Sequence, residues 1–299
     1  MSEEGTVPHR LRGSLAGLTR YDRAGRGQPV VLLHGLGMKA AIWAPQREEL
    51  ARDYDVVAPD MLGHGGASLP PAEARLSDYS DQLLALLDGL GLGAAHLVGH
   101  SMGALISLDF ALAHPERVLS IVALNGVYCR SAEQQAAALQ RAAALAREGN
   151  LASPEDTLAR WFGAPVPAAL AAHAETARAM LGSVDPVGYA RTYRVFAGSD
   201  AEHRGRLEQL AVPALFMTGE LDPNSTPQMS RAMAAAAPFG RCEILAGERH
   251  MMTLTAPLLV SERIRAFHRD IAREAIPTNR TPADADHPSA GGTAKTIPA

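Results

Sequence analysis

The sequence predicts an α/β fold: a mostly parallel central sheet, helices on both of its faces, and one inserted helical segment. Short apolar runs alternate with stretches of helical spacing over most of the 299 residues, which is the pattern of β–α–β units. In the middle of the chain the strand-like runs disappear, and helical patterns follow one another from about residue 127 to residue 210. A sheet interrupted once by helices accounts for both observations.

The first part of the chain supplies elements of the sheet in turn. Residues 30–33 form an apolar run that ends abruptly at His34-Gly35, and residues 55–58 form another that ends at Pro59-Asp60. Residues 76–90 carry leucines at helical spacing and predict an amphipathic helix. We expect strands at residues 30–33, 55–58, 95–98 and 118–124, and helices at residues 41–52, 76–90 and from residue 104 onward.

The second part contains the insertion and the last strands. Residues 127–210, called the helical insertion from here on, are interpreted as a helical lid, or cap, over one edge of the sheet. Its predicted helices cover residues 131–147, 154–162, 165–181 and 186–196. We expect a flexible N-terminus at residues 1–10, an α/β core at residues 11–126 and 211–275 with further strands at residues 214–218 and 242–245, and a disordered tail rich in Pro, Thr, Ala and Gly at residues 276–299.

Composition narrows the choice of partners. A net charge of −4 provides no basic surface for nucleic acid or for an anionic membrane. No apolar run approaches the roughly 18 residues that a membrane-spanning helix needs, and the first ten residues have no apolar core of signal-peptide type. Cys129 and Cys242 match no metal or redox spacing and are interpreted as free thiols. We expect a cytoplasmic protein that acts on a small molecule without a cofactor or metal; a homo-oligomeric state is left open.

Ser101 is the first candidate for chemistry. It lies at the centre of Gly99-His100-Ser101-Met102-Gly103, between an apolar strand and a helical run. A Gly-x-Ser-x-Gly in that context is the signature of a nucleophile elbow, a tight turn that lifts the serine hydroxyl clear of the sheet. Glycines on either side are needed because larger side chains would collide in such a turn. The sequence therefore predicts that Ser101 is a nucleophile.

A serine nucleophile needs a base and a group that orients the base. His250 is the best of the eleven histidines, because it follows the last predicted strand after a short loop and so points to the sheet edge of Ser101. The loop after the preceding strand offers Glu220 and Asp222 as the acid. Asp222 is favoured because the turn before Pro223 holds it, while Glu220 is still close to the strand. The chain order Ser101, Asp222, His250 differs from that of the chymotrypsin and subtilisin triads.

An oxyanion hole completes the predicted site. Attack on an acyl carbon places negative charge on the former carbonyl oxygen, which needs two preorganised N–H donors. The backbone N–H of Met102, directly after the nucleophile, is expected to supply one of them. The backbone N–H of Leu36 is expected to supply the other, since Gly35 and Gly37 let that loop turn inward.

With these pieces in place, the chain resembles the α/β-hydrolase superfamily over roughly residues 14–273. It departs from the family pattern at Ser68, which comes one residue late in its loop, and at Arg249, where glycine is frequent. The motifs that carry the resemblance are His34 to Gly37, Asp60 to Ser68, Gly99 to Gly103, Gly219 to Pro223 and His250-Met251.

Within the superfamily the chain looks most like the group of 3-oxoadipate enol-lactonases and cofactor-free haloperoxidase-type esterases. The pointers to this branch are Arg160 to Gly163, Asp185 to Tyr189 and Gly219 to Pro227. The resemblance implies a serine hydrolase that cleaves a carboxylic ester or lactone of a small organic acid through an acyl-enzyme. The serine at position 101 argues against haloalkane dehalogenases and epoxide hydrolases, which require an aspartate there.

Two alternatives stay open. A carbon–carbon bond hydrolase acting on a vinylogous diketone, of the meta-cleavage-product type, would use the same triad and a similar lid. A non-catalytic receptor would use the pocket for binding alone, and would leave a fluorophosphonate probe unreacted. Substrate contacts are expected from the helical insertion and the loop before His250: Trp161 in an apolar wall, and Arg191, Arg194 or Arg249 on a carboxylate.

Overall fold

A computed structural model describes residues 2–10, 16–148, 154–199 and 201–275 of the chain. Their strands form one eight-stranded sheet in the order β1-β2-β4-β3-β5-β6-β7-β8. The strand β2 pairs antiparallel with β1 and β4, and all other neighbours pair in parallel, so the predicted fold class is confirmed. The strands are β1 (Ser2–Arg10), β2 (Ala16–Gly25), β3 (Gln28–Leu33), β4 (Tyr54–Pro59), β5 (Ala95–His100), β6 (Val118–Leu124), β7 (Ala214–Gly219) and β8 (Gly240–Leu245).

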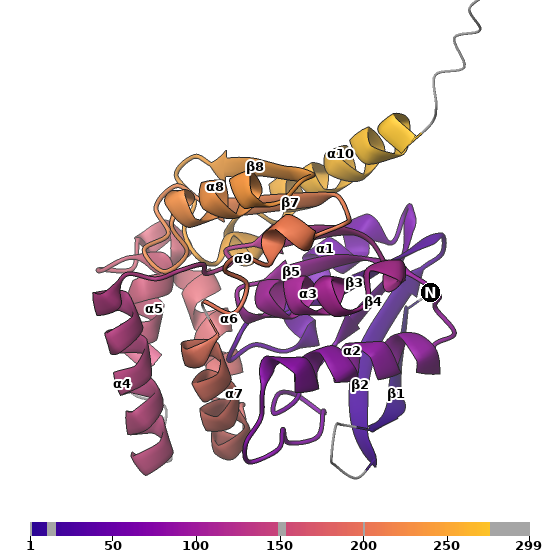
Figure 1. The fold of residues 1–299 in the computed structure, drawn as a ribbon. Coiled ribbons are helices and arrows are strands. Elements are labelled where there is room, and N and C mark those ends of the chain that lie inside the picture. Colours follow the sequence, from indigo (N-terminus) through magenta and orange to yellow (C-terminus); the bar gives the residue numbers. More distant parts are fainter. Residues whose placement is uncertain (1, 11–15, 149–153, 200, 276–299) are drawn as a thin grey trace, which may run out of the picture.

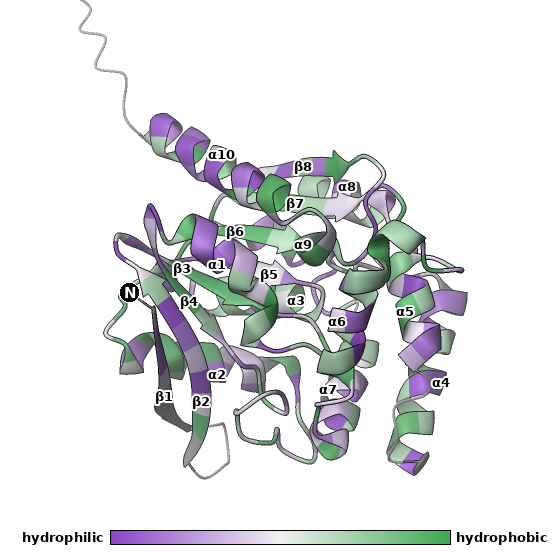
Figure 2. Cartoon of the chain, turned by 180° about the vertical axis from the view of Figure 1, so that it is seen from behind, coloured by the Kyte–Doolittle hydropathy of each residue, from purple (hydrophilic) through white to green (hydrophobic). Residues whose placement is uncertain are grey.

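Helices cover both faces of this sheet (Figures 1 and 2). The helices α2 and α3 pack together on one face, and α1 and α10 pack together on the other. Parallel strands covered in this way need apolar side chains on both sides, which explains why β5 is buried along its whole length. The core helices are α1 (Ala44–Leu50), α2 (Leu76–Gly89), α3 (Met102–Ala113), α8 (Pro227–Ala236), α9 (Met252–Thr255) and α10 (Pro257–Ala275).

The helical insertion follows β6 and precedes β7. Its described residues contain helices and no strand, and the helices stand together on one side of the molecule (Figure 1). The side chain of Asp185 accepts a hydrogen bond from Gly188 N and caps α7, with Pro186 in the first turn. The helices of the insertion are α4 (Ala132–Glu148), α5 (Pro154–Phe162), α6 (Ala171–Leu181) and α7 (Pro186–Gly198).

The N-terminal segment differs from the expected flexible chain at residues 1–10. Ser2–Arg10 forms β1 and pairs with Ala16–Gly25 in an antiparallel ladder. An edge strand of this kind is joined to the sheet by backbone hydrogen bonds on one side only, so it does not need the apolar pattern that marks an internal strand. The expected tail at residues 276–299 lies outside the described residues.

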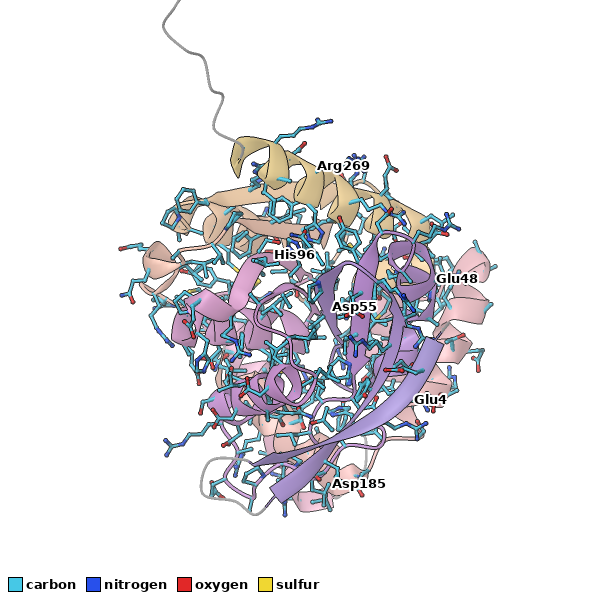
Figure 3. The ribbon with its side chains drawn as sticks, turned by 90° about the vertical axis from the view of Figure 1, so that its right-hand side faces the viewer. Glu4, Glu48, Asp55, His96, Asp185 and Arg269 are labelled. Carbon is cyan, nitrogen blue, oxygen red and sulfur yellow. The ribbon has the colours of Figure 1, made fainter. Side chains whose placement is uncertain are left out.

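A partly buried ion pair joins β2 to the parallel part of the sheet. Asp55 of β4, labelled in Figure 3, accepts two hydrogen bonds from the guanidinium of Arg23 on β2, at 2.9 and 2.7 Å. The pKa of Arg23 is raised mainly by this hydrogen bond, in spite of partial burial. The bidentate geometry orients the antiparallel edge against the parallel core.

Candidate active site

Ser101 stands in a strained turn between β5 and α3. Its φ of 55° and ψ of −111° are rare for a residue with a side chain, and the turn leaves space for no Cβ at the neighbouring glycines. A Cβ on Gly99 would lie 2.1 Å from the carbonyl oxygen of Gly103, and one on Gly103 would lie 2.2 Å from that of Leu33. The turn therefore has the geometry predicted for a nucleophile elbow.

Asp222 and His250 meet at the same sheet edge. His250 Nδ1 donates to Asp222 Oδ2 over 2.7 Å, and both side chains are almost completely buried. Glu220, the other candidate acid, instead accepts a hydrogen bond from Gly247 N at the surface. Asp222 Oδ1 accepts from the N–H groups of Asn224 and Ser225, which fixes the carboxylate in the turn after β7.

The electrostatics keep Asp222 ionised. Burial alone would raise the pKa of Asp222, but the positive charge and hydrogen bond of His250, together with hydrogen bonds from Asn125 and Asn224, outweigh burial and lower it. Asp222 Oδ2 accepts a hydrogen bond from His250 Nδ1–H, which leaves Nε2 of that ring with its lone pair available to accept a proton. No hydrogen bond joins His250 to Ser101 in the described part of the chain, although both line one cavity.

Two residues that sequence reasoning missed support this pair. Asn125, the first residue after β6, has a φ of 50° and donates from Nδ2 to Asp222 Oδ2 over 2.8 Å. Asparagine tolerates this left-handed conformation better than most residues, and its place at the carboxyl end of β6 was the available signal. His100 Nε2 donates to the backbone carbonyl of His250 over 2.8 Å, and His100 lines the same cavity as Ser101 and His250.

Two neutral histidines, His34 and His64, form hydrogen bonds that fix the loop containing Leu36 and the neighbouring loop after β4. His64 Nε2 accepts the N–H of Gly37 over 3.0 Å, and His34 Nε2 accepts the N–H of Met61 over 3.0 Å. These partners assign the ring proton to Nδ1 in both cases. Burial lowers the pKa of His34 to about 4 and that of His64 to about 3, so the acceptor form persists at neutral pH.

The residues predicted to supply the oxyanion donors lie in the elbow itself and in the loop that packs against it. Gly35 approaches so closely that a Cβ there would lie 3.2 Å from Ser101 Cβ. The N–H groups of Leu36 and Met102 donate to no acceptor among the described residues. Two unused donors beside one serine hydroxyl are what a developing oxyanion requires.

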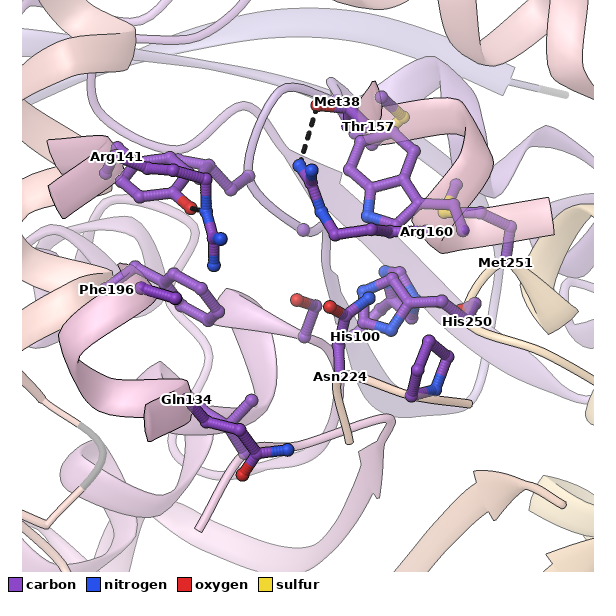
Figure 4. A pocket seen from close by; sticks show the side chains of 18 of the residues that line it. Met38, His100, Gln134, Arg141, Thr157, Arg160, Phe196, Asn224, His250 and Met251 are labelled. Atoms are coloured by element: carbon purple, nitrogen blue, oxygen red, sulfur yellow. Dashed lines mark hydrogen bonds between the residues drawn. The ribbon is translucent and has the colours of Figure 1, made fainter. Parts of the chain in front are cut away.

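A cavity of about 250 Å³ opens above Ser101 and His250. It lies between the sheet edge and the helical insertion (Figure 4). Trp161 lines it as predicted for a wall residue, and its ring stacks on His250 with centroids 6.1 Å apart. The volume lies below the usual range for drug-sized ligands, about 300–1,000 Å³, which favours a small substrate.

The structure does not bring the expected arginines into this cavity. Arg191 donates to the carbonyl of Pro70 over 2.7 Å, and Arg194 donates to the carbonyl of Ala72 and contacts Glu73. Arg249 packs against Gly163, and its Nη1 reaches the carbonyl of Leu221 at 3.4 Å. Helical periodicity explains why Arg191 and Arg194 of α7 do not reach the cavity. The face of α7 that lines the cavity carries Tyr189, Tyr193 and Phe196, so residues 191 and 194 lie on other faces of the helix.

Other arginines line the cavity in their place. Arg130 precedes α4, Arg141 lies on α4 and Arg160 on α5, and all three belong to the cavity wall. The positions of Arg141 and Arg160 could have been predicted from the sequence, because each lies at helical spacing from other residues that line the cavity. Gln134, Ala137 and Arg141 share one face of α4, and Thr157, Arg160 and Trp161 share one face of α5.

Two further kinds of feature are absent from the described residues. Among the described residues, no group of three or more His, Cys, Asp or Glu side chains is arranged to hold a metal ion. Within the same residues, no helix is both long enough and apolar enough to cross a membrane.

Comparisons with known proteins agree with this architecture. The model of the alpha/beta hydrolase fold family matches residues 28–257. A protein of Acinetobacter baylyi named (E)-2-((N-methylformamido)methylene)succinate hydrolase is 39% identical over 247 residues, which cover 83% of this chain and 92% of that protein.

Solved structures resemble the chain over most of its length. A thermophilic esterase from Thermogutta terrifontis, solved with malate bound, superposes with a TM-score of 0.79 at 25% identity, covering 90% of this chain and 99% of that one. The enol-lactonase from Burkholderia xenovorans has a TM-score of 0.78 at 24% identity, covering 88% and 99%, and shows the shared fold.

Proposed function

The chain belongs to the α/β-hydrolase family and is a hydrolytic enzyme, and we propose that it is a serine hydrolase that cleaves a carboxylic ester or lactone of a small organic acid. The observation that carries the proposal is the arrangement around one small cavity: Ser101 in a strained elbow, and His250 held by Asp222 over 2.7 Å. A binding protein would need no such pairing of a buried carboxylate with a histidine beside a lifted serine.

The geometry supports an acyl-enzyme mechanism. Ser101 Oγ attacks the acyl carbon while His250 Nε2 accepts its proton, and Asp222 stabilises the imidazolium through Nδ1. The N–H groups of Leu36 and Met102 hold the oxyanion. Collapse of the tetrahedral intermediate expels the alcohol, which takes the proton from His250. A water molecule then attacks the acyl carbon with His250 again as base, and the acid is released.

The name of the Acinetobacter baylyi relative widens the substrate panel. It describes a succinate that carries an N-methylformamide group. A formamide has an acyl carbon that a serine can attack by the same steps, with an amine in place of the alcohol as leaving group. Amides of this type therefore belong beside esters and lactones in any screen of this enzyme.

A carbon–carbon bond hydrolase remains the second candidate, because a vinylogous diketone could be cleaved with the same serine, histidine and aspartate. The two candidates differ in the substrate and not in the triad. Cleavage of a coloured ring-cleavage dienolate removes its colour and releases a carboxylic acid, so bleaching by the purified protein together with formation of that acid would favour this candidate over ester hydrolysis.

The direct test of the proposal uses a fluorophosphonate probe and a panel of small esters, lactones and amides. The wild-type protein is expected to be labelled at Ser101 and to hydrolyse at least one ester or lactone. Ser101→Ala should abolish labelling and lower kcat by several orders of magnitude. Ser107→Ala is the matched control, since Ser107 is buried in α3 with its hydroxyl bonded to the carbonyl of Gly103. Labelling that survives in Ser101→Ala would refute the assignment of the nucleophile.

A further inference from the structure

Two guanidinium groups enter the cavity and have no acidic partner there. Arg141 reaches in from α4 and Arg160 from α5 (Figure 4). Each is held by one neutral oxygen: Arg141 Nε donates to the Tyr193 hydroxyl over 2.8 Å, and Arg160 Nη2 donates to the Thr157 hydroxyl over 2.9 Å. The cavity wall, as far as the structure describes it, contains neither Asp nor Glu.

The positive charges of Arg141 and Arg160 act on each other. Burial and the neighbouring charge of Arg141 lower the pKa of Arg160, which means that the two like charges are close enough to repel each other. Asp156, which does not line the cavity, is solvent-exposed. Its negative charge raises the pKa of Arg160 by less than burial and Arg141 lower it. A guanidinium has five N–H donors, and each of these groups uses one on the protein, so several point to no protein acceptor.

We propose that Arg141 and Arg160 together bind a carboxylate of the substrate, at a distance from the bond that is cleaved. Two planar guanidinium groups match the two oxygens of a carboxylate, and the anion would offset the repulsion between them. The hydroxyls of Tyr193 and Thr157 position the pair before the substrate arrives. Neither arginine has a role in acyl transfer itself, so the pair determines specificity.

The proposal names a substrate class. Because Ser101 and the arginine pair share one cavity of about 250 Å³, the substrate is small enough for its acyl carbon and its carboxylate to be bound together. It is a half-ester, a carboxylated lactone or a half-amide of a dicarboxylic acid, whose hydrolysis yields a dianion. The substrate class rests on the proposed serine hydrolase function, because its kinetic effects require turnover. Binding of a carboxylate by the arginine pair does not require turnover.

The kinetic test compares monomethyl glutarate with the methyl ester of glutaric acid monoamide, in which a neutral amide replaces the carboxylate. Wild-type kcat/KM is expected to be higher for the carboxylated ester. Arg160→Gln and Arg141→Gln should each lower that preference by about 10- to 100-fold, the range for losing a charge-assisted hydrogen bond, mainly through KM. Arg194→Gln, on the outer side of α7, should leave the preference unchanged. A preference that stays within threefold of wild type in both cavity variants would overturn the proposal.

The binding test separates this inference from the proposed function, since it needs no turnover. Calorimetry measures the affinity of glutarate for Ser101→Ala and for the same protein with Arg160→Gln or Arg160→Lys added. Glutarate should bind to Ser101→Ala, weaken about tenfold or more with Arg160→Gln, and be partly restored with Arg160→Lys. Equal affinity in all three proteins, or tighter binding of inorganic phosphate than of glutarate, would overturn the carboxylate subsite. Intact glutarate binding without hydrolysis of any ester would instead count against the proposed function alone.

Discussion

Lowering the pH is expected to unfold this protein through its buried histidines. Burial lowers the pKa of His96 to about 4, against an ordinary value of 6.5. The folded protein therefore keeps the ring neutral at a pH where the unfolded chain binds a proton. The sign follows directly: stability is unaffected above pH 6.5 and is lost as the pH falls from 6.5 towards 4. His96 belongs to the internal strand β5 (Figure 3), and its ring stacks on that of His268 with centroids 4.0 Å apart.

The magnitude can be worked from the printed values. At pH 5 a histidine of pKa 6.5 in the unfolded state and about 4 in the folded state costs about 2 kcal/mol of stability, since each unit is worth about 1.4 kcal/mol. Five such groups would remove on the order of 10 kcal/mol, comparable to the whole stability of a typical domain. The five are His34, His64, His96, His100 and His203.

Urea unfolding measured between pH 7.5 and pH 5 tests this expectation. The free energy of unfolding should fall steeply over that range, and the folded state should be largely lost near pH 5. His96→Gln provides the quantitative control, because it removes one titrating ring from a position remote from Ser101. Its loss of stability between pH 7.5 and pH 5 should be smaller than that of the wild type by about 2 kcal/mol or more, because the charge of His96 also lowers the pKa of the neighbouring His268. A wild-type stability that is flat from pH 7.5 to pH 5, or an unchanged slope in His96→Gln, would refute the reasoning.

Three further perturbations address the site. Gly103→Ala places a Cβ 2.2 Å from the Leu33 carbonyl oxygen, so about 3 kcal/mol of stability should be lost in urea unfolding, and a native-like midpoint would contradict the packing of the elbow. Asp222→Asn should lower kcat by roughly 10³–10⁴-fold, because the amide cannot stabilise the imidazolium; a change below tenfold on the best substrate would point to another acid. Asn125→Ala removes a hydrogen-bond donor from Asp222 Oδ2, so kcat should fall by about tenfold with KM little changed, and an unchanged kcat would deny Asn125 its positioning role.

Most of the sheet could be predicted because its strands are buried on both faces. Val30, Val31 and Leu32 of β3 have no exposed surface, and such runs stand out in a sequence. The edge strand β1 could not be found in this way, since a strand that is hydrogen-bonded along one side can carry almost any side chain.

Part of the candidate site could also be predicted from the sequence, and part could not. Ser101, Asp222 and His250 follow the parallel strands β5, β7 and β8, whose carboxyl ends lie at one edge of the sheet, so the topology brings them to the same edge. The arginines depend on which stripe of each inserted helix faces the cavity, and that orientation is set by packing. Tyr193 turns inward and Arg194, one residue later, turns outward; composition cannot distinguish them, although helical spacing could have indicated the choice.

The separation of the site residues along the chain has a consequence for synthesis. Ser101 and its elbow lie in the first half of the polypeptide, whereas His250 follows β8 and lies close to the C-terminal helix. A growing chain folds from its N-terminus, so the elbow can form while the base has not yet been made. A product of premature termination before residue 250 would carry the serine without its base. Synthesis must therefore pass residue 250 before the proposed nucleophile and its proposed base can act together, and shorter products would lack the proposed base.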